Sequence, residues 1–583
     1  MKLIKILVLS LVFTLSISLA YGQSEVLKSA VKTELDRSMR EFSKEEKAPY
    51  FLSYYVTETM ENRLTASFGK LINVRRYSGL TTDQHTRIVD IDLRVGSYDF
   101  DNTHVIRGAY DPFGRLSVSS SLPIEDDENA IRVALWNNTE KAYRDAAEKF
   151  EKAVSNKAVK VAEEDSSADF SKEFPNKYRE DYKKRYYSEI EARGDANAFV
   201  IDTAKWNAII CRLSDKFNKY PWIFDGSVTL NSTLKNKYYL DSEGSEISFP
   251  ETYVRIMISA KTKAEDGMSL PLYKDYFAFS CDGLPSEELM AQDIDKMIDL
   301  LDRLRTAETA TTFTGPAILS GEASGVFFHE IFGHRVEGHR EKDPAFSHTF
   351  KEFVGKKILP EFMSVTFDPS MKEINGREIS GYYKYDDEGQ KGERVETVKD
   401  GIFQTYIMSR SPIKGFPNSN GHGRRSSGHS AVARQSNLIV SSTNQKTISE
   451  LRNMLIEEAK KQGKEYGLFF DRVTGGFTLI DRSMPNSFNV TPLVVYKIYV
   501  DGRPDELVRG VDLIGTPLTT FEKITATGDD LGIFNGMCGA ESGWVPVSAS
   551  SPSLFVSTIE VQKKSKSQTK LPILPAPVNP INP

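Results

Sequence analysis

The chain has 583 residues with a 39% hydrophobic composition, which is enough for two or three domains with substantial cores. It carries 75 Lys and Arg residues against 81 Asp and Glu residues, a formal net charge of −6. This mildly acidic balance, without a dense basic tract, argues against nucleic acid as a partner.

The N-terminus predicts export. Lys2 and Lys5 flank the start of an apolar stretch from Ile6 to Ile17, and small residues follow it. This order is typical of a secretory signal peptide, which we place at residues 1–22. An uncleaved anchor is the alternative, but the stretch is shorter than the ~20 apolar residues that span a bilayer. We therefore expect a periplasmic or extracellular protein with no membrane span after signal removal.

Residues 23–125 are predicted to form an N-terminal α+β domain. Apolar residues recur at helical spacing over 24–44, and runs typical of strands follow at 50–58 and 64–76. Apolar and polar residues then alternate over 88–95, as expected for a strand with one buried face.

Residues 126–310 are predicted to form a middle α+β region. A helical pattern spans about 127–160, and a charged tract near 161–195 predicts a solvated insertion. The aromatic and β-branched residues of 224–282, with turn signals between them, predict antiparallel strands. A further helix is expected over 294–304.

Residues 311–562 are predicted to form a mainly β C-terminal domain, because short apolar runs alternate with turns that contain glycine. The chief helix of that domain should carry the histidine motif described below. The proline-rich tail, residues 563–583, has no sustained periodicity. The predicted fold class is α+β, a mixed helix and antiparallel-sheet region followed by a mainly β domain.

Two histidines and a glutamate form the most informative motif of the chain. His329, Glu330 and His334 lie within six residues after an apolar run. Neutral imidazole is a good zinc ligand, and a glutamate beside it can accept a proton from water at the metal. Histidines five positions apart lie roughly 140° apart on an ideal helix, too far to share one ion. The backbone must therefore deviate, and Gly333 is the predicted place, as a π-bulge or an early helix end.

Only three cysteines are present, Cys211, Cys281 and Cys538. Cys538 lies between glycines in a segment that suits a loop bringing a thiolate to a metal. Cys211 and Cys281 lie in apolar runs that suit a core. The sequence does not decide whether these two cysteines form a disulfide.

Seven ordered blocks of residues carry a resemblance to a known family. They are Gly321–Gly325, Val336–Gly338, Asp386–Gly389, Gly423–Arg425, Arg509–Gly515, Asn535–Gly539 and Val545–Ser548. With the H-E-x-x-x-H motif among them, the chain from about residue 315 to 562 resembles the C-terminal part of the TldD/PmbA metallopeptidases.

The resemblance implies a zinc peptidase that acts on small or unfolded peptides, and with the signal pattern it predicts an exported one. Zn²⁺ would be held by His329, His334 and Cys538, with Glu330 as the general base. It also implies association into dimers, either homodimers or heterodimers with a related subunit.

A polar loop is a second candidate region. His422, Gly423, Arg424 and His429 are predicted to bind substrate, because the loop matches a family block and could present donors to a carbonyl. The alternative is a glycine-rich surface turn.

The rival functional interpretation is a noncatalytic exported peptide-binding or partner subunit with a structural zinc. Structural zinc usually has four protein ligands, and His339 could be the fourth. Glu330 favours catalysis.

Overall fold

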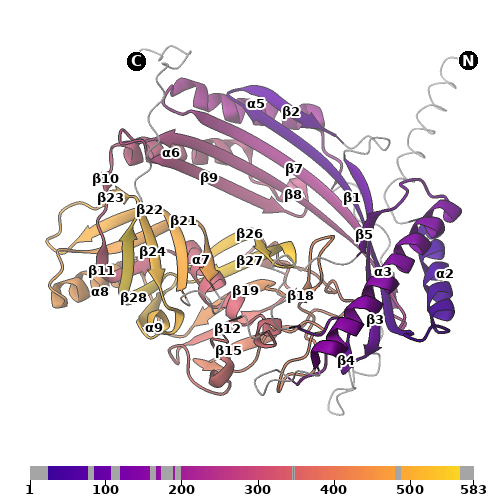
Figure 1. Ribbon diagram of the computed structural model, residues 1–583. Coiled ribbons are helices and arrows are strands. Elements are labelled where there is room, and N and C mark those ends of the chain that lie inside the picture. The colour runs from indigo at the N-terminus through magenta and orange to yellow at the C-terminus, as the bar shows by residue number, and fades with distance from the viewer. Residues whose placement is uncertain are drawn as a thin grey trace, which may run out of the picture.

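The computed structural model describes residues 24–76, 84–106, 118–157, 166–172, 188–190, 199–343, 346, 348–479 and 487–564. These residues form a large curved sheet with flanking helices and a mainly β C-terminal domain (Figure 1). The α+β prediction is confirmed. The predicted signal peptide, most of the charged tract and most of the tail lie outside the described residues.

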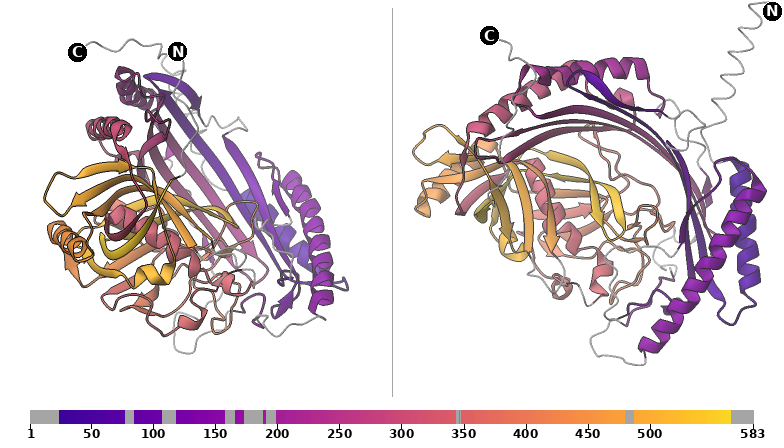
Figure 2. Two further views of the ribbon diagram at one scale, coloured as in Figure 1. Left: turned by 60° about the vertical axis from the view of Figure 1, so that its left-hand side comes forward. Right: turned by 45° about the horizontal axis from the view of Figure 1, so that its top comes forward.

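The first sheet has nine strands in the path β4-β3-β1-β7-β8-β6, with β2, β5 and β9 pairing at its sides. Its strands are β1 Pro49–Ser67, β2 Lys70–Arg75, β3 His85–Ser97, β4 Phe100–Asp101, β5 Val118–Ser121, β6 Ser188–Ile190, β7 Asp225–Asp241, β8 Glu246–Lys263 and β9 Ser269–Ala278. Strands from both predicted N-terminal regions therefore lie in one sheet. The sheet arches over the C-terminal domain (Figure 2).

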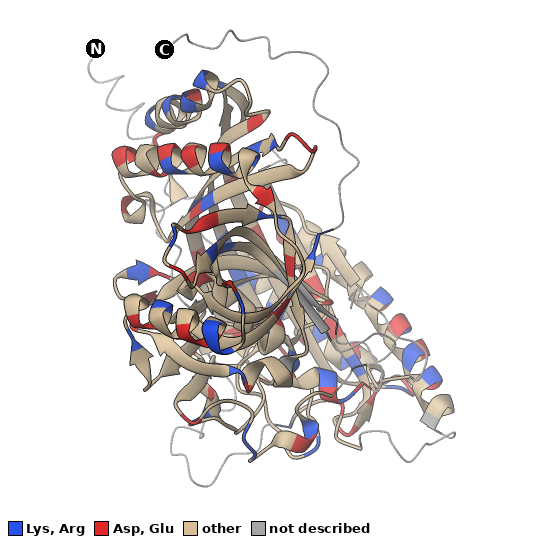
Figure 3. Ribbon diagram, turned by 90° about the vertical axis from the view of Figure 1, so that its left-hand side faces the viewer, with Lys and Arg blue, Asp and Glu red and all other residues tan. Residues whose placement is uncertain are grey.

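Four helices pack on this sheet. Helices α2 (Glu25–Phe42) and α3 (Glu128–Lys157) share a core with β1, β3 and β7. Helices α5 (Thr203–Asp215) and α6 (Glu287–Thr306) cover the convex face and bury apolar residues of β7 and β8. Basic and acidic residues are interspersed along these outer helices (Figure 3). Helices α2, α3 and α6 agree with the predicted helical patterns, and α5 contains the apolar run around Cys211.

One strand differs from its prediction. Residues 50–58 and part of 64–76 form the single long strand β1 instead of two strands. Residues 59–63 between them continue the strand, because exposed Glu61 and Arg63 alternate with buried Met60 and Asn62. A buried carboxylate also lies within β1. Glu58 is 3% exposed and accepts hydrogen bonds from Arg87 at 2.8 Å, with His85 also 2.8 Å away. A paired buried carboxylate is tolerated inside a strand.

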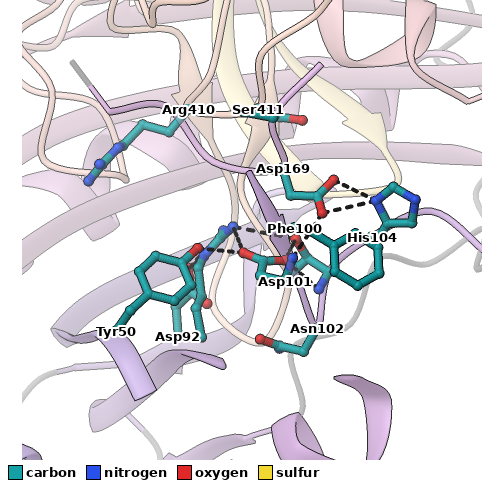
Figure 4. A network of polar contacts seen from close by, with 12 residues as sticks. Tyr50, Asp92, Phe100, Asp101, Asn102, His104, Asp169, Arg410 and Ser411 are labelled. Atoms are coloured by element: carbon teal, nitrogen blue, oxygen red, sulfur yellow. Dashed lines mark hydrogen bonds and ion pairs between the residues drawn. The ribbon is translucent and has the colours of Figure 1, made fainter. Parts of the chain in front are cut away.

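Part of the charged tract is a buried strap between the sheet and the C-terminal domain (Figure 4). Asp169 is 3% exposed and pairs with His104 at 2.9 Å and with Lys342 at 3.1 Å. Phe170 lies between the guanidinium groups of Arg94 and Arg410, each 3.8 Å from its ring centre. At residues 169–171 the expectation of a solvated insertion is wrong, because these residues are buried and contact both parts of the molecule.

The C-terminal domain contains a nine-stranded and a six-stranded sheet. The first holds β10 Glu308–Thr309, β11 Phe313–Leu319, β20 Gln445–Lys446, β21 Tyr466–Leu479, β22 Ser487–Tyr499, β23 Glu506–Arg509, β24 Val511–Gly515, β25 Ile524–Gly528 and β28 Leu554–Lys563. The second holds β12 Met363–Phe367, β15 Val395–Lys399, β16 Ile402–Phe403, β19 Asn437–Ser442, β26 Gly532–Ala540 and β27 Gly543–Ser551. The mainly β prediction for this domain is confirmed.

Helix α7 (Gly321–Ile331) carries the histidine motif and packs against strands of both sheets. The domain also contains α8 (Ile448–Lys461) and α9 (Pro517–Phe521). Helix α8, with 14 residues, is longer than α7, with 11, so the motif helix is the central helix of the domain but not its longest. Across the described ranges, the helices are too short or too polar to cross a bilayer.

Candidate metal centre

Two glycines let α7 lie directly on the β26–β27 hairpin. A Cβ atom on Gly321 would stand 2.3 Å from the backbone nitrogen of Gly532, and one on Gly325 would stand 2.8 Å from the carbonyl oxygen of Ala549. Neither position has room for a side chain. The Gly321–Gly325 block of the sequence therefore serves a close approach that brings the helix to the strand carrying Cys538.

The helix ends before the second histidine. Helix α7 stops at Ile331, and a 3₁₀ turn follows over Gly333–Arg335. A Cβ atom on Gly333 would stand 2.0 Å from Oε1 of Gln435 and would displace this side chain, whose Nε2 donates to the carbonyl oxygen of His329 at 3.2 Å. The change of helix type brings the rings of His329 and His334 to a centre-to-centre distance of 5.1 Å. The predicted deviation is confirmed as an early helix end.

Cys538 completes a cluster with the two histidines. One ligand atom from each of His329, His334 and Cys538 lies within 4.8 Å of the others. Sγ of Cys538 is 3.4 Å from Nε2 of His334. All three side chains are buried, with exposed fractions of 5%, 7% and 4%. The structure thus brings together the three predicted ligands, while Cys211 and Cys281 are both free thiols.

A buried carboxylate orients the second histidine. Glu337 is 0% exposed, and its Oε2 lies 3.1 Å from Nδ1 of His334. The same oxygen accepts hydrogen bonds from Arg340 at 2.8 and 3.0 Å. Burial works against ionisation, but His334 and Arg340 lower the pKa of Glu337 to about 2. A carboxylate that accepts a hydrogen bond from one ring nitrogen fixes the tautomer and leaves the lone pair of the other nitrogen free to bind a metal.

A fully buried arginine holds the cysteine. Nη2 of Arg434 donates to Sγ of Cys538 at 3.0 Å and to its carbonyl oxygen at 2.8 Å. Burial opposes ionisation of the thiol, but the charges of His334 and Arg434 outweigh it and hold the pKa of Cys538 well below its usual value. The thiolate is the form that binds metals.

The donor set fits zinc. Two imidazoles and a thiolate are the ligand types that Zn²⁺ prefers, and catalytic zinc sites commonly have three protein ligands. Nδ1 of His329 is buried and has no hydrogen-bond partner within the described part of the chain, as expected for a nitrogen that binds a metal ion. Glu330, 7% exposed, is the residue next to the first histidine on α7.

His339 is engaged elsewhere. Its Nε2 pairs with the carboxylate of Glu541, which also accepts a hydrogen bond from Arg340 at 2.9 Å. The ligand cluster found among the described residues contains His329, His334 and Cys538 and not His339. A fourth protein ligand, which the structural-zinc interpretation needs, is thus not supplied by His339.

The four residues of the predicted substrate loop lie in different surroundings. Arg424 is among the residues lining a cavity of about 620 Å³, whereas His422, Gly423 and His429 are not. The amide of Gly423 donates to Asp386 at 2.8 Å, and Nδ1 of His429 lies 3.2 Å from the carbonyl oxygen of Ser427. Only Arg424 is in a position to contact a molecule in this cavity.

His422 is buried inside the protein, where its ring contacts neighbouring residues. It is 0% exposed, with Nδ1 at 3.1 Å from the carbonyl oxygen of Asn420 and Nε2 at 3.1 Å from Oγ of Ser436. Burial lowers the pKa of His422 to about 3, and the charge of Arg424 adds to the shift. The ring is therefore neutral in the folded protein.

We expect His422 to make the protein sensitive to acid. Because its folded pKa of about 3 lies below the ~6.5 of an unfolded histidine, the stabilisation is complete above pH ~6.5 and is lost as the pH falls toward 3. The expected slope is about 1.4 kcal/mol per pH unit. Urea unfolding of the wild type and of His422→Gln at pH 7, 6, 5 and 4 measures it. The variant should lose less stability over this range; equal pH slopes would contradict the assignment.

The Asp386–Gly389 block joins the N-terminal sheet to this loop. Asp387 accepts a hydrogen bond from Tyr55 of β1 at 2.7 Å and another from the amide of Arg425 at 2.8 Å. Gly389 has φ +73°, and a Cβ atom there would stand 2.4 Å from the ring of Tyr239. The block thus fixes the position of the substrate loop relative to β1 and β7.

Comparison with known proteins agrees with this arrangement. Residues 312–563 match the PmbA/TldA metallopeptidase C-terminal domain. A metalloprotease of Archaeoglobus fulgidus is 26% identical over 316 residues, covering 54% of this chain and 68% of that protein. A zinc metalloprotease TldD homolog of Saccharolobus solfataricus is 25% identical over 248 residues, covering 42% and 51%. Several of these relatives are thus matched over only about half of their length.

Solved structures share the fold over most of the chain. TldE from Thermococcus kodakarensis has a TM-score of 0.58 at 10% identity, covering 91% of this chain and 100% of that one. A Bacteroides thetaiotaomicron protein described as a candidate modulator of DNA gyrase has a TM-score of 0.57 at 13% identity, covering 93% and 99%. The fold and the match over residues 312–563 define a metallopeptidase C-terminal domain. Residues 312–563 thus belong to the C-terminal domain family of the TldD/PmbA metallopeptidases.

Two residues of the centre had not been assigned a role from the sequence. Glu337 lies three positions after His334, and a carboxylate at that spacing is a signal that could have suggested an orienting partner. Arg434 is 104 positions from Cys538 and carries no local signal.

Proposed function

We propose that this chain is an exported zinc-dependent peptidase that hydrolyses small or unfolded peptides. The observation that carries the proposal is the buried cluster of His329, His334 and Cys538, whose ligand atoms lie within 4.8 Å, with Glu330 beside the first ligand. Relatives named as metalloproteases support the reaction class.

In this proposal His329, His334 and Cys538 hold the ion, and Glu337 keeps Nε2 of His334 directed to it. A zinc ion in such a site polarises a carbonyl and makes water a nucleophile near neutral pH. The carboxylate of Glu330 accepts a proton from the attacking water and returns it to the leaving amine. Burial of the cluster excludes bulk water, which strengthens each of these interactions.

Export and association are further parts of the proposal. The signal-like pattern of residues 1–22 supports a periplasmic or extracellular location. Family membership supports association into a homodimer or a heterodimer with a related subunit.

The test couples metal analysis to cleavage. We expect the purified chain to hold about one zinc per subunit and to cut a stably unfolded polypeptide faster than the same polypeptide in folded form. A chelator should abolish the cleavage, and added zinc should restore it. Zinc binding without chelator-sensitive cleavage of any unfolded substrate would instead favour the noncatalytic binding subunit.

A further inference from the structure

The cavity of about 620 Å³ lies between the curved sheet and the C-terminal domain. Strands β1, β7, β8 and β9 supply one wall, and loops and the β26–β27 hairpin of the C-terminal domain supply the other. Figures 1 and 2 show the sheet arching over this domain. The volume falls within the roughly 300–1,000 Å³ of sites for small ligands.

The cavity does not contain the metal cluster. Met537 and Trp544 line it, and Met537 pairs with Pro546 while Gly539 pairs with Trp544 across the hairpin. Met537 and Trp544 are exposed, whereas Cys538 packs with Val545 and Val547 in a buried cluster on the other face, although Val545 also contributes to the cavity wall. A molecule bound here would be separated from the metal ligands by the hairpin.

Aromatic side chains form much of the wall. They are Tyr55, Tyr253, Phe277, Phe279, Tyr382, Tyr383, Tyr385 and Trp544. Trp544 is 65% exposed, which is unusual for so large an apolar residue. Such a wall favours an apolar or extended ligand with few polar groups.

Several charges in the cavity are already neutralised in pairs. Lys237 lies 2.6 Å from Glu251, and Arg425 lies 2.6 Å from Asp90. Asp386 accepts three backbone hydrogen bonds, which oppose the rise in its pKa that burial causes. Because these groups already have partners, they do not favour a charged ligand.

Three cations that line the cavity have no carboxylate in contact within the described ranges, the exposed Lys372 and the more enclosed Arg424 and Lys235. Arg424 is 6% exposed; its Nη1 donates to the carbonyl oxygen of Gln435 at 2.6 Å, and its guanidinium lies over the ring of Tyr383 at 4.6 Å. Within the described ranges, no carboxylate oxygen lies within 4.0 Å of the side-chain nitrogens of Arg424 or Lys235. Burial raises the pKa of Asp387, but Lys237, Arg425 and Arg424 lower it, so Arg424 has a carboxylate nearby without contacting it. A ligand carboxylate would give this buried guanidinium a direct partner.

We propose that this cavity binds the C-terminal carboxylate of a peptide, with Arg424 as its hydrogen-bonding partner and Lys235 as a second positive charge. The inference rests on the proposed peptidase function and adds to it a site that holds a nonreacting end of the peptide. A terminal carboxylate is present in every unmodified peptide whatever its sequence. The planar guanidinium matches that group with two parallel hydrogen bonds.

Binding is measured on full-length Glu330→Gln protein loaded with zinc, so that hydrolysis does not consume the probe. The probe is a fluorescent hexapeptide of alanine and leucine, as the free acid and as the C-terminal amide, followed by anisotropy. We expect the acid to bind about 10-fold or more tightly than the amide, because a hydrogen-bonded charge is lost on amidation. Quenching of Trp544 fluorescence should accompany binding, and a Trp544→Phe variant identifies that signal.

Matched variants assign the carboxylate partner. Arg424→Gln should remove most of the acid-over-amide preference, and Lys235→Gln should reduce it. The control is Lys261→Gln, an exposed lysine of β8 outside the cavity, which should leave the preference unchanged. Equal binding of acid and amide would overturn the proposal, as would an undiminished preference in both cavity variants. Displacement of the acid by equimolar inorganic phosphate would also overturn it, because the cavity would then be a general anion site.

Wild-type protein stripped of metal by chelator is the second nonhydrolysing form. The acid-over-amide preference should persist in it, because the hairpin separates the cavity from the metal ligands. If the protein prefers the acid but cleaves no peptide, the peptidase proposal is refuted and the carboxylate site is supported. If it cleaves peptides but does not prefer the acid, the carboxylate site is refuted and the peptidase proposal is supported.

Discussion

Glu330→Gln is expected to retain zinc and to lose peptide cleavage by about 10²- to 10⁴-fold, the usual contribution of a general base. The amide has the shape of the carboxylate but cannot accept the proton. Glu330 is buried, at 7% exposure, and lies on α7 next to His329, so the substitution leaves the ligand set intact. The measurement is kcat/KM on an unfolded substrate, with zinc content determined on the same sample.

The matched control lies on the same helix. Glu322→Gln changes the same chemistry in the first turn of α7, away from the cluster, and should leave both zinc content and cleavage unchanged. If Glu330→Gln cleaves peptides at the wild-type rate, another group is the base. If Glu330→Gln loses zinc together with activity, Glu330 helps to hold the metal. The loss of kcat/KM then says nothing about proton transfer.

The local part of the metal centre could be predicted from the sequence. The five-residue spacing of His329 and His334 is incompatible with one helical face, and this alone required a break near Gly333. Cys538 lies 204 positions from His334, and no spacing rule connects residues so far apart. Its assignment came from resemblance, and the structure adds the reason, since Gly321 and Gly325 let the helix lie on the strand that carries it.

The cavity and the strap could not be predicted in this way. The contact between Tyr55 and Asp387 joins residues 332 positions apart, and each sequence segment alone is unremarkable in charge and polarity. Asp169 was assigned to a solvated tract because its neighbours are charged, yet it is buried by partners from both parts of the molecule. Composition predicts exposure only where no distant partner exists.

His422 illustrates a further limit. A histidine in a glycine-rich loop beside a family block suggests a ligand contact, whereas the structure buries its ring completely and gives both nitrogens a partner. Its neighbour Arg424 is the residue that reaches the cavity. Which side chain of the loop faces the cavity depends on the pairing of β17 (Gly423–Arg424) with β18 (Val432–Ala433).

Cys538→Ala is expected to weaken zinc binding by more than about 100-fold. Loss of a residue that hydrogen-bonds to a metal ligand typically lowers metal affinity 10- to 100-fold. Loss of the thiolate ligand itself should lower the affinity further. Competition with a chromophoric chelator measures the affinity. The melting temperature with and without added zinc gives an independent measure, because a metal that binds only the folded state stabilises it.

Cys211→Ala is the control, since this thiol is free, partly buried in a helix and outside the cluster. It should bind zinc with wild-type affinity and show the same rise in melting temperature. In Cys538→Ala, Arg434 keeps its hydrogen bonds to Ser542 at 2.7 Å and to the carbonyl oxygen of Gly543 at 3.1 Å, so the hairpin should stay in place without the thiol. A folded Cys538→Ala protein that holds zinc as tightly as the wild type would refute Cys538 as a ligand. The centre would then have to be built from His329, His334 and a group other than this thiolate.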